Sequence, residues 1–213
     1  ILAMLVQVLD MTIANVALPH MQAALGANQD SISWVLTSYI VASAIAIPAT
    51  GWLSDTIGRR KLYLLSVGGF TLSSVLCGLA VNLDTMVLFR ILQGLFGAFL
   101  APLGQTVMLD NTAPEKRGQA MAIFGMGVLI SPILGPVVGG WLTDNMNWRW
   151  VFFVNLPIGL AQMPLGNVIG GAFFLLALFA ALASSISLME VAVSWLDERT
   201  GVTRWGAAIG VGF

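Results

Sequence analysis

Two ionisable side chains lie inside long apolar segments of this sequence. Asp10 is flanked by apolar residues on both sides, and Arg90 lies in another apolar segment with Gln93 one helical turn further on. Charges inside a membrane span are costly and usually mark ion pathways or proton relays. These residue types predict a proton-titrating carboxylate and a basic residue that face a water-filled cavity. Two alternatives stay open: Asp10 reaches water from a helix end, or Arg90 is an interfacial cation.

A second group of charges interrupts the apolar sequence at GWLSDTIGRRK, residues 51–61. Gly51 and Gly58 bracket Asp55, and a basic cluster begins at Arg59 and Arg60. We predict a polar loop in which the basic residues fix the topology of the chain. Acidic residues contribute little to topology, so Asp55 and the paired glycines require another explanation.

Glycine and proline recur along residues 119–142. The four residues of interest are Gly135, Pro136, Gly139 and Gly140. The small-xxx-small spacing of Gly135 and Gly139 allows close contact with another helix. Pro136 removes a backbone donor and favours a kink. The pattern predicts either tight packing alone or a bend that shapes one side of a transport cavity.

The composition places these groups in a membrane protein. Hydrophobic residues make up 58% of the 213-residue chain, charged residues 9%, and the mean hydropathy is +0.90. A soluble domain is about 25% charged, so we predict an all-α integral membrane protein embedded in a lipid bilayer. The net charge of −1 provides no basic field for nucleic acid. The sequence shows no nucleophile–base pair and no metal-ligand cluster, so we expect neither an enzyme nor a bound cofactor.

Six apolar segments are long enough, or nearly so, to cross a bilayer as helices. We predict them at residues 1–19, 33–53, 62–81, 86–109 and 119–142, with the sixth beginning near residue 150. The apolar start at Ile1 suggests that the N-terminus is trimmed.

Basic residues in the connections predict the orientation of these helices. Alternate loops carry five basic residues (Arg59, Arg60, Lys61, Lys116 and Arg117) against one, Arg149. Because basic loops stay in the cytoplasm, we expect residues 54–61 and the N-terminus to be cytoplasmic and the protein to be a multi-pass protein of the inner membrane.

Five motifs in this order resemble those of a known transporter family. They are LDMTIANVALP (9–19), GWLSDTIGRR (51–60), RILQGLFGA (90–98), SPILGPVVGG (131–140) and NWRWVFFVNLPIG (147–159). Residues 1–160 thereby resemble the N-terminal six-helix half of a major facilitator superfamily transporter. The nearest likeness is to its fourteen-helix drug:proton antiporter branch. Thr56 and Ser131 depart from the usual motif residues.

The resemblance assigns a role to each motif. Asp10 and Arg90 become candidates for proton coupling, and Gln93 and Gly94 belong to the helix-four motif. Gly51, Asp55, Gly58, Arg59 and Arg60 would form a conformational latch whose arginine pairs with acids on neighbouring helices. Gly135, Pro136, Gly139 and Gly140 correspond to the antiporter motif. The energy source would be a proton gradient and the substrate an amphipathic small molecule.

Residues 161–213 resemble a different family. AQMPLG, GGAFFLLALFAALASSISLMEV and DERTGVTR are similar to the neurotransmitter:sodium symporters around their eighth helix. The likeness predicts one further transmembrane helix and a truncated helix. Ala180 and Ser184 would be the remnant of a sodium site, from which one hydroxyl is missing at Ala183. We therefore expect a fused or truncated product with no working metal site.

Three functions follow from these patterns. The first is proton-coupled efflux of drugs or other amphipathic molecules by an incomplete transporter, which would need a homodimer or a separate second half. The second is a transport-inactive membrane fragment that self-associates or binds a full-length transporter. The third is sodium-coupled amino-acid symport, which only residues 161–213 support.

Overall fold

The computed structural model describes residues 2–162, which form helices joined by short connections and contain no strand. The elements are α1 (Leu2–Leu25), η1 (Ser31–Ser33), α2 (Trp34–Ala46), η2 (Ile47–Ala49), α3 (Thr50–Ile57), α4 (Arg59–Leu79), α5 (Leu83–Gly97), α6 (Leu100–Asp110), η3 (Pro114–Lys116), α7 (Arg117–Asn145), α8 (Trp150–Phe153) and α9 (Asn155–Ala161). Five segments within this range are long and apolar enough to span a membrane, and a shorter apolar helix covers Trp150–Ala161. The predicted all-α membrane fold is confirmed. The two helices expected further along lie outside the described residues.

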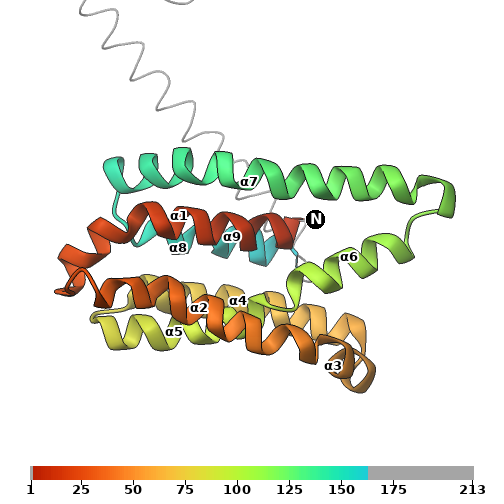
Figure 1. Ribbon diagram of the computed structural model, residues 1–213, viewed down its shortest axis with the longest axis horizontal. Helices are drawn as coiled ribbons and strands as arrows, with labels where there is room; N and C mark the ends of the chain where they lie inside the picture. The colour runs from red at the N-terminus through yellow and green to blue at the C-terminus, as the bar shows by residue number, and fades with distance from the viewer. Residues whose placement is uncertain (1, 163–213) are drawn as a thin grey trace, which may run out of the picture. The chain divides into compact units, whose positions relative to one another are not determined.

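The helices pack in two groups that α8 and α9 connect. α1 lies along α7, while α5 packs against both α2 and α4 (Figure 1). α8 and α9 contact α4 on one side and α1 on the other. α8 and α9, the sixth predicted span, therefore link α1 to the group formed by α2, α4 and α5.

α1 is longer than its sequence suggests. We predicted an end near Pro19, but the helix continues through Pro19 to Leu25. Proline removes one backbone hydrogen bond, yet the following MQAAL segment consists of good helix formers. Met21 is buried in the apolar core there, and its packing favours the extra turn.

The stretch at residues 51–61 is not the polar loop that we predicted. α3 continues to Ile57, α4 starts at Arg59, and Gly58 alone separates them. Gly58 has φ +92°, which glycine adopts without the steric penalty of a Cβ atom. One residue therefore reverses the chain, and the charged side chains lie on two helix ends.

Three prolines lie close to interruptions in the predicted spans. Pro48 lies in η2 between α2 and α3, Pro102 lies in the first turn of α6, and Pro157 lies in α9. Each proline lacks the N–H that would bond the carbonyl four residues earlier. That missing bond favours the interruption of the second, fourth and sixth spans, although α1 and α7 continue through their own prolines.

The core consists of two apolar clusters with polar residues between them. One cluster contains Ile13, Val35, Cys77 and Met86, and the other contains Val6, Tyr39, Phe70 and Leu100. On α1, α4 and α5 buried polar residues lie between the two clusters: Asp10, Ser74, Arg90 and Gln93. A polar layer therefore crosses the middle of the helix bundle.

Gly135 and Gly139 bring α7 close to α1. A Cβ atom at Gly135 would overlap the Thr12 side chain, and one at Gly139 would lie 3.2 Å from Cα of Ile13. The predicted close helix contact is confirmed at these two positions. α7 continues through Pro136, which is exposed, and a Cβ atom at Gly140 would meet nothing within 4 Å.

We predict that Gly135→Ala lowers the free energy of unfolding in detergent by about 1–3 kcal/mol, because the added methyl group overpacks the α1 contact. The matched control is Gly125→Ala on the same helix, where an added Cβ atom meets nothing within 4 Å. That control should be neutral or stabilising by up to about 1 kcal/mol. Unfolding curves in mixed micelles would measure both, and equal effects would contradict the close α1–α7 contact.

Candidate functional site

The polar layer is built around an ion pair between Asp10 and Arg90. Nη1 of Arg90 donates to Oδ2 of Asp10 at 2.6 Å, and the two side chains are 0% (Arg90) and 1% (Asp10) exposed. They do not face the water-filled cavity that we predicted. Each charge is solvated by the other and by neighbouring polar groups, which is how buried charges are usually stabilised.

Gln93 joins both members of the pair. Its Nε2 donates to Oδ1 of Asp10 at 2.9 Å, and its Oε1 accepts from Nη1 of Arg90 at 2.7 Å. Arg90 and Gln93 lie one turn apart on α5, so both point toward α1. The motif RILQGLFGA, which lies on the fourth predicted span and begins in α5, thus supplies two of the groups that hold Asp10.

Arg90 is also held by α2. Its Nε donates to the carbonyl of Val35 at 3.0 Å, and the guanidinium carbon lies 4.4 Å from the centre of the Tyr39 ring. A cation above an aromatic face is attracted by the ring quadrupole. α2 thereby fixes the orientation of the guanidinium toward Asp10.

Two further residues complete the layer, and neither was predicted from the sequence. Nδ2 of Asn155 donates to Oδ1 of Asp10 at 2.5 Å and to Oγ of Ser74 at 2.8 Å. Ser74 in turn donates to the carbonyl of Phe152 at 2.8 Å. An amide within the apolar stretch VFFVNLP was a usable signal for Asn155, whereas a serine in an apolar helix is too common to stand out.

Gly94 permits α5 to pack against α2 beside this layer. A Cβ atom at Gly94 would lie 2.5 Å from the Tyr39 carbonyl oxygen, and Oγ of Ser43 donates to the Gly94 carbonyl at 3.0 Å. A larger residue at position 94 would push α2 away from Arg90.

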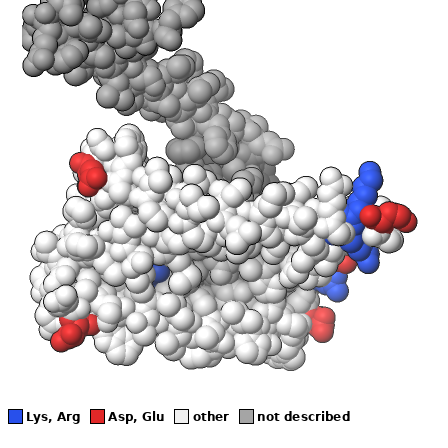
Figure 2. Space-filling view, turned by 45° about the horizontal axis from the view of Figure 1, so that its top comes forward, with Lys and Arg blue, Asp and Glu red and all other residues white. Residues whose placement is uncertain are grey.

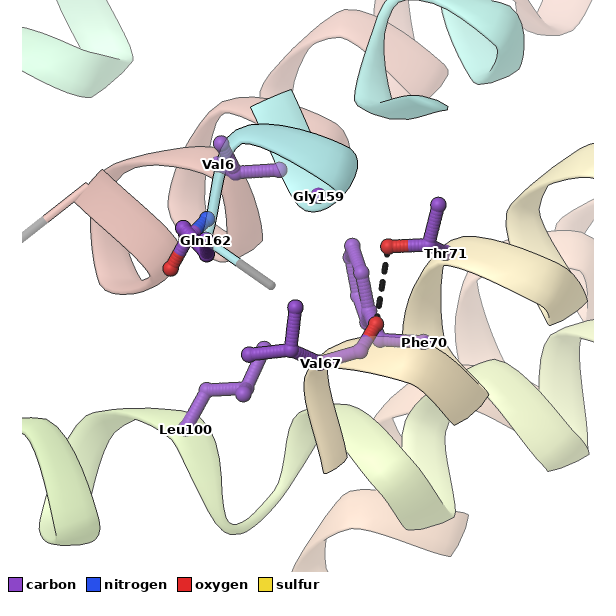
Figure 3. A pocket seen from close by; sticks show the side chains of 7 residues that line it. All are labelled: Val6, Val67, Phe70, Thr71, Leu100, Gly159 and Gln162. Carbon is purple, nitrogen blue, oxygen red and sulfur yellow. Dashed lines mark hydrogen bonds between the residues drawn. The ribbon is translucent and has the colours of Figure 1, made fainter. Parts of the chain in front are cut away.

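A small apolar recess lies one turn from the polar layer (Figure 3). Val6, Val67 and Leu100 line it together with Gly159 of α9, which faces Thr71. Thr71 donates to the carbonyl of Val67, within its own helix, at 2.7 Å. The recess therefore offers packing space and little polar chemistry.

The charged residues of the predicted latch lie at one end of the helices, away from Asp10. Figure 2 shows basic and acidic atoms together at that end, acidic atoms at the other, and a mostly uncharged band between them. Nη1 of Arg59 donates to Oδ2 of Asp110 at 2.7 Å, which links the start of α4 to the end of α6. Gly51, Asp55 and Arg60 are exposed, and neither Asp55 nor Arg60 forms a salt bridge with another residue in the range 2–162.

The structure thus divides the predicted site residues among three places. Asp10, Arg90 and Gln93 meet in the buried layer, the latch residues lie at the charged end, and Gly135 and Gly139 lie at the α1–α7 contact. Ala180 and Ser184 lie outside the described residues, so the sodium-site remnant stays a prediction.

Comparison with known proteins agrees with this architecture. The sequence model of the Major Facilitator Superfamily matches residues 1–168. The chain belongs to this superfamily. It is accordingly a multi-pass membrane protein of a transporter superfamily and no enzyme.

Similar proteins in bacteria include named multidrug exporters. The chain is 48% identical over 160 residues to the multidrug export protein EmrB of Haemophilus influenzae, a match that covers 75% of this chain and 31% of that protein. It is 49% identical over 164 residues to the probable multidrug resistance protein EmrY of Escherichia coli, covering 77% of this chain and 32% of that protein. The chain therefore spans about a third of the length of these relatives.

The crystal structure of a D-xylose-proton symporter has the same fold. The TM-score is 0.63 at 14% sequence identity, and the match covers 98% of this chain and 63% of the symporter. At this identity the likeness concerns the fold alone.

We predict a strongly non-additive double-mutant cycle for the buried ion pair. Asp10→Leu or Arg90→Leu alone should lower the free energy of unfolding in detergent by about 3–5 kcal/mol, because each leaves an uncompensated buried charge. The double variant should recover most of that loss. Additive losses, measured by denaturant titration in micelles, would contradict a mutually stabilising pair.

The Arg59–Asp110 pair should behave differently. Its side chains are 56% and 55% exposed, so Asp110→Asn should change the free energy of unfolding by less than about 1 kcal/mol. That small effect should vanish at about 1 M salt, where the Debye length is about 3 Å. A loss well above this size that persists in salt would show that the pair is a structural anchor.

Proposed function

We propose that this chain contributes the proton-coupling half of an exporter of amphipathic small molecules, driven by a proton gradient. The observation that carries the proposal is the buried Asp10–Arg90 pair, which joins the first and fourth spans and has Gln93 bonded to both members. A carboxylate inside a membrane bundle with a fixed basic partner is a typical proton-binding group in transporters.

Proton binding would change the energetics of the layer. The ionised Asp10 balances the charge of Arg90, whereas the protonated side chain does not, so proton binding leaves the guanidinium uncompensated. A conformation that brings water to Arg90 would then gain relative stability. This dependence of conformation on protonation is the coupling that an antiporter requires.

The substrate class rests on the relatives and on the shape of the fold. EmrB and EmrY are named as multidrug proteins. In this superfamily the substrate site lies near the midplane of the bilayer between two six-helix halves. Residues 2–162 form one half, so we infer that the second wall comes from outside this range, for example from a second copy of the chain or from a separate second half.

The remaining expectations extend this proposal. We infer that the basic end, with Arg59, Arg60, Lys61, Lys116 and Arg117, faces the cytoplasm of an inner membrane, because basic loops are retained there. The Arg59–Asp110 pair would act as one contact of a latch that breaks as the halves rock. Both side chains are exposed, so the contact between them is weak. A weak contact suits a latch, because it leaves the inward-open and outward-open states both accessible.

A second candidate function is association without transport. Large apolar side chains are exposed along α7 (Leu129, Ile133 and Val137) and along α2 (Ile40 and Ile45). These faces suit lipid, and they equally suit a second copy or a full-length transporter that the chain could bind. Sodium-coupled symport gains no support from the described residues.

We predict that purified chain in proteoliposomes accumulates a lipophilic cationic dye when the vesicle interior is acidified. Asp10→Asn should reduce this accumulation to the level of empty vesicles, because its amide does not take up a proton at these pH values. Asp144→Asn, which changes an exposed carboxylate at a helix end, is the matched control and should keep the activity.

Two results would contradict the proposal. Unchanged dye accumulation by Asp10→Asn would remove Asp10 from proton coupling. No accumulation by a folded wild-type chain that cross-links as a dimer would favour association without transport.

A further inference from the structure

Asn155 connects the coupling carboxylate to the sixth span through a single amide group. It begins α9, immediately after the interruption at Val154, and its side chain is buried. Its amide nitrogen lies between two acceptors, Oδ1 of Asp10 at 2.5 Å and Oγ of Ser74 at 2.8 Å. Within the described residues, Nδ2 of Asn155 forms these two hydrogen bonds, and Oδ1 of the same side chain forms none.

The hydrogen bonds around Asp10 suit only its ionised form. The carboxylate accepts from Arg90 on Oδ2 and from Gln93 and Asn155 on Oδ1. A protonated carboxyl group has an O–H that needs an acceptor of its own. Oε1 of Gln93 already accepts from Arg90 and from the Cys77 thiol, so of the two amides bonded to Asp10, Asn155 is the one that can change from donor to acceptor.

We propose that Asn155 is a positioning residue whose side-chain amide rotates by half a turn when Asp10 takes up a proton. The proposal rests on the proton coupling described above. The amide oxygen would then occupy the place of the amide nitrogen, between Asp10 and Ser74. From there it accepts from the new O–H of Asp10, and the same oxygen can accept from the Ser74 hydroxyl.

The rotation of the Asn155 amide would also change a hydrogen bond between α4 and α8. Ser74 has one hydroxyl hydrogen, which it now donates to the Phe152 carbonyl. When that hydrogen turns to the Asn155 oxygen, the Phe152 carbonyl loses its partner on α4. Protonation on α1 thereby loosens the contact between α4 and the last turn of α8, beside the break at Val154.

The proton balance of this step is simple. One proton from the more acidic aqueous side forms an O–H bond on Oδ1 of Asp10, whose charge becomes zero, and no other covalent bond changes. Arg90 keeps its charge and its contact with Oδ2. The other titratable groups of the polar layer are Tyr39 of α2 and Cys77 of α4, which already carry protons at neutral pH in their ordinary state.

No other charged group of the described helices faces this layer from within the bundle. The remaining acids and bases of the described residues lie near helix ends or in connections: His20, Asp30, Asp55, Arg59, Arg60, Lys61, Asp84, Asp110, Glu115, Lys116, Arg117, Asp144 and Arg149. Acidification that adds a proton to the polar layer should therefore protonate Asp10.

Infrared difference spectroscopy of the reconstituted full chain tests the rotation directly. The protein is labelled with ¹³C at the asparagine side-chain carbonyl, and spectra are compared before and after acidification. We expect a protonated-carboxyl band and a shifted asparagine carbonyl band with the same pH midpoint. Asn155→Leu should lose the asparagine band and keep the carboxyl band. The double variant Asp10→Leu/Arg90→Leu, which avoids an unpaired charge, should lose both.

The outcomes separate this proposal from the proposed function. A carboxyl band assigned to Asp10 with no asparagine shift would overturn the rotation and leave proton coupling intact. Absence of any carboxyl band that depends on Asp10 would overturn both.

A pair of serine variants tests the connection to α8. In the wild type, hydrogen exchange of the α8–α9 amides, corrected for intrinsic pH dependence, should rise roughly fivefold on acidification, as expected for the loss of one buried hydrogen bond. Ser74→Ala should show the raised exchange already at neutral pH and gain nothing on acidification. Ser66→Ala is the matched control, because this buried serine donates only to Leu62 of its own helix, and it should behave as the wild type. Equal behaviour of the two variants would overturn the connection.

Discussion

The ion pair between Asp10 and Arg90 constrains the whole arrangement of helices. Two charges without access to water are tolerated only when each has a close partner and further hydrogen bonds. Gln93, Asn155 and the Val35 carbonyl supply those bonds, so α1, α2, α5 and α9 must all meet at one level. The apolar clusters above and below this layer exclude water from it. Packing alone would permit the helices to slide along one another, whereas the polar contacts fix their register.

Two other features complement this fixed centre. Gly135 and Gly139 allow α7 to approach α1 closely, beside the turn that carries Asp10. At the charged end, Gly58 reverses the chain in one residue and places Arg59 beside Asp110. At the centre, the Asp10–Arg90 pair is buried and its members interact strongly. At the charged end, the Arg59–Asp110 pair is exposed and its members interact weakly. Strong contacts at the centre and weak ones at the surface are consistent with the proposal that Asp10 binds the coupled proton and that the exposed end rearranges.

Much of this could be predicted from the sequence, and the failures have identifiable causes. The apolar segments and the isolated charges are visible because a membrane tolerates few exceptions. Pro19 suggests a helix end, but the packing of Met21 outweighs the missing hydrogen bond. Contact between Asp10 and Arg90 could not be foreseen, because two residues 80 positions apart meet only through the topology of the fold. Asn155 and Ser74 were missed because their role lies in the partners that the fold brings to them.

Proton release on substrate binding tests the central claim most directly. Purified chain in weakly buffered detergent would be titrated with ethidium, and the released protons followed with a pH indicator. If Asp10 is the coupling carboxylate, ethidium binding should release protons from the wild type, and Asp10→Asn should bind the dye without releasing any, as reciprocal linkage between the two ligands requires. Equal release by the wild type and Asp10→Asn would contradict the account.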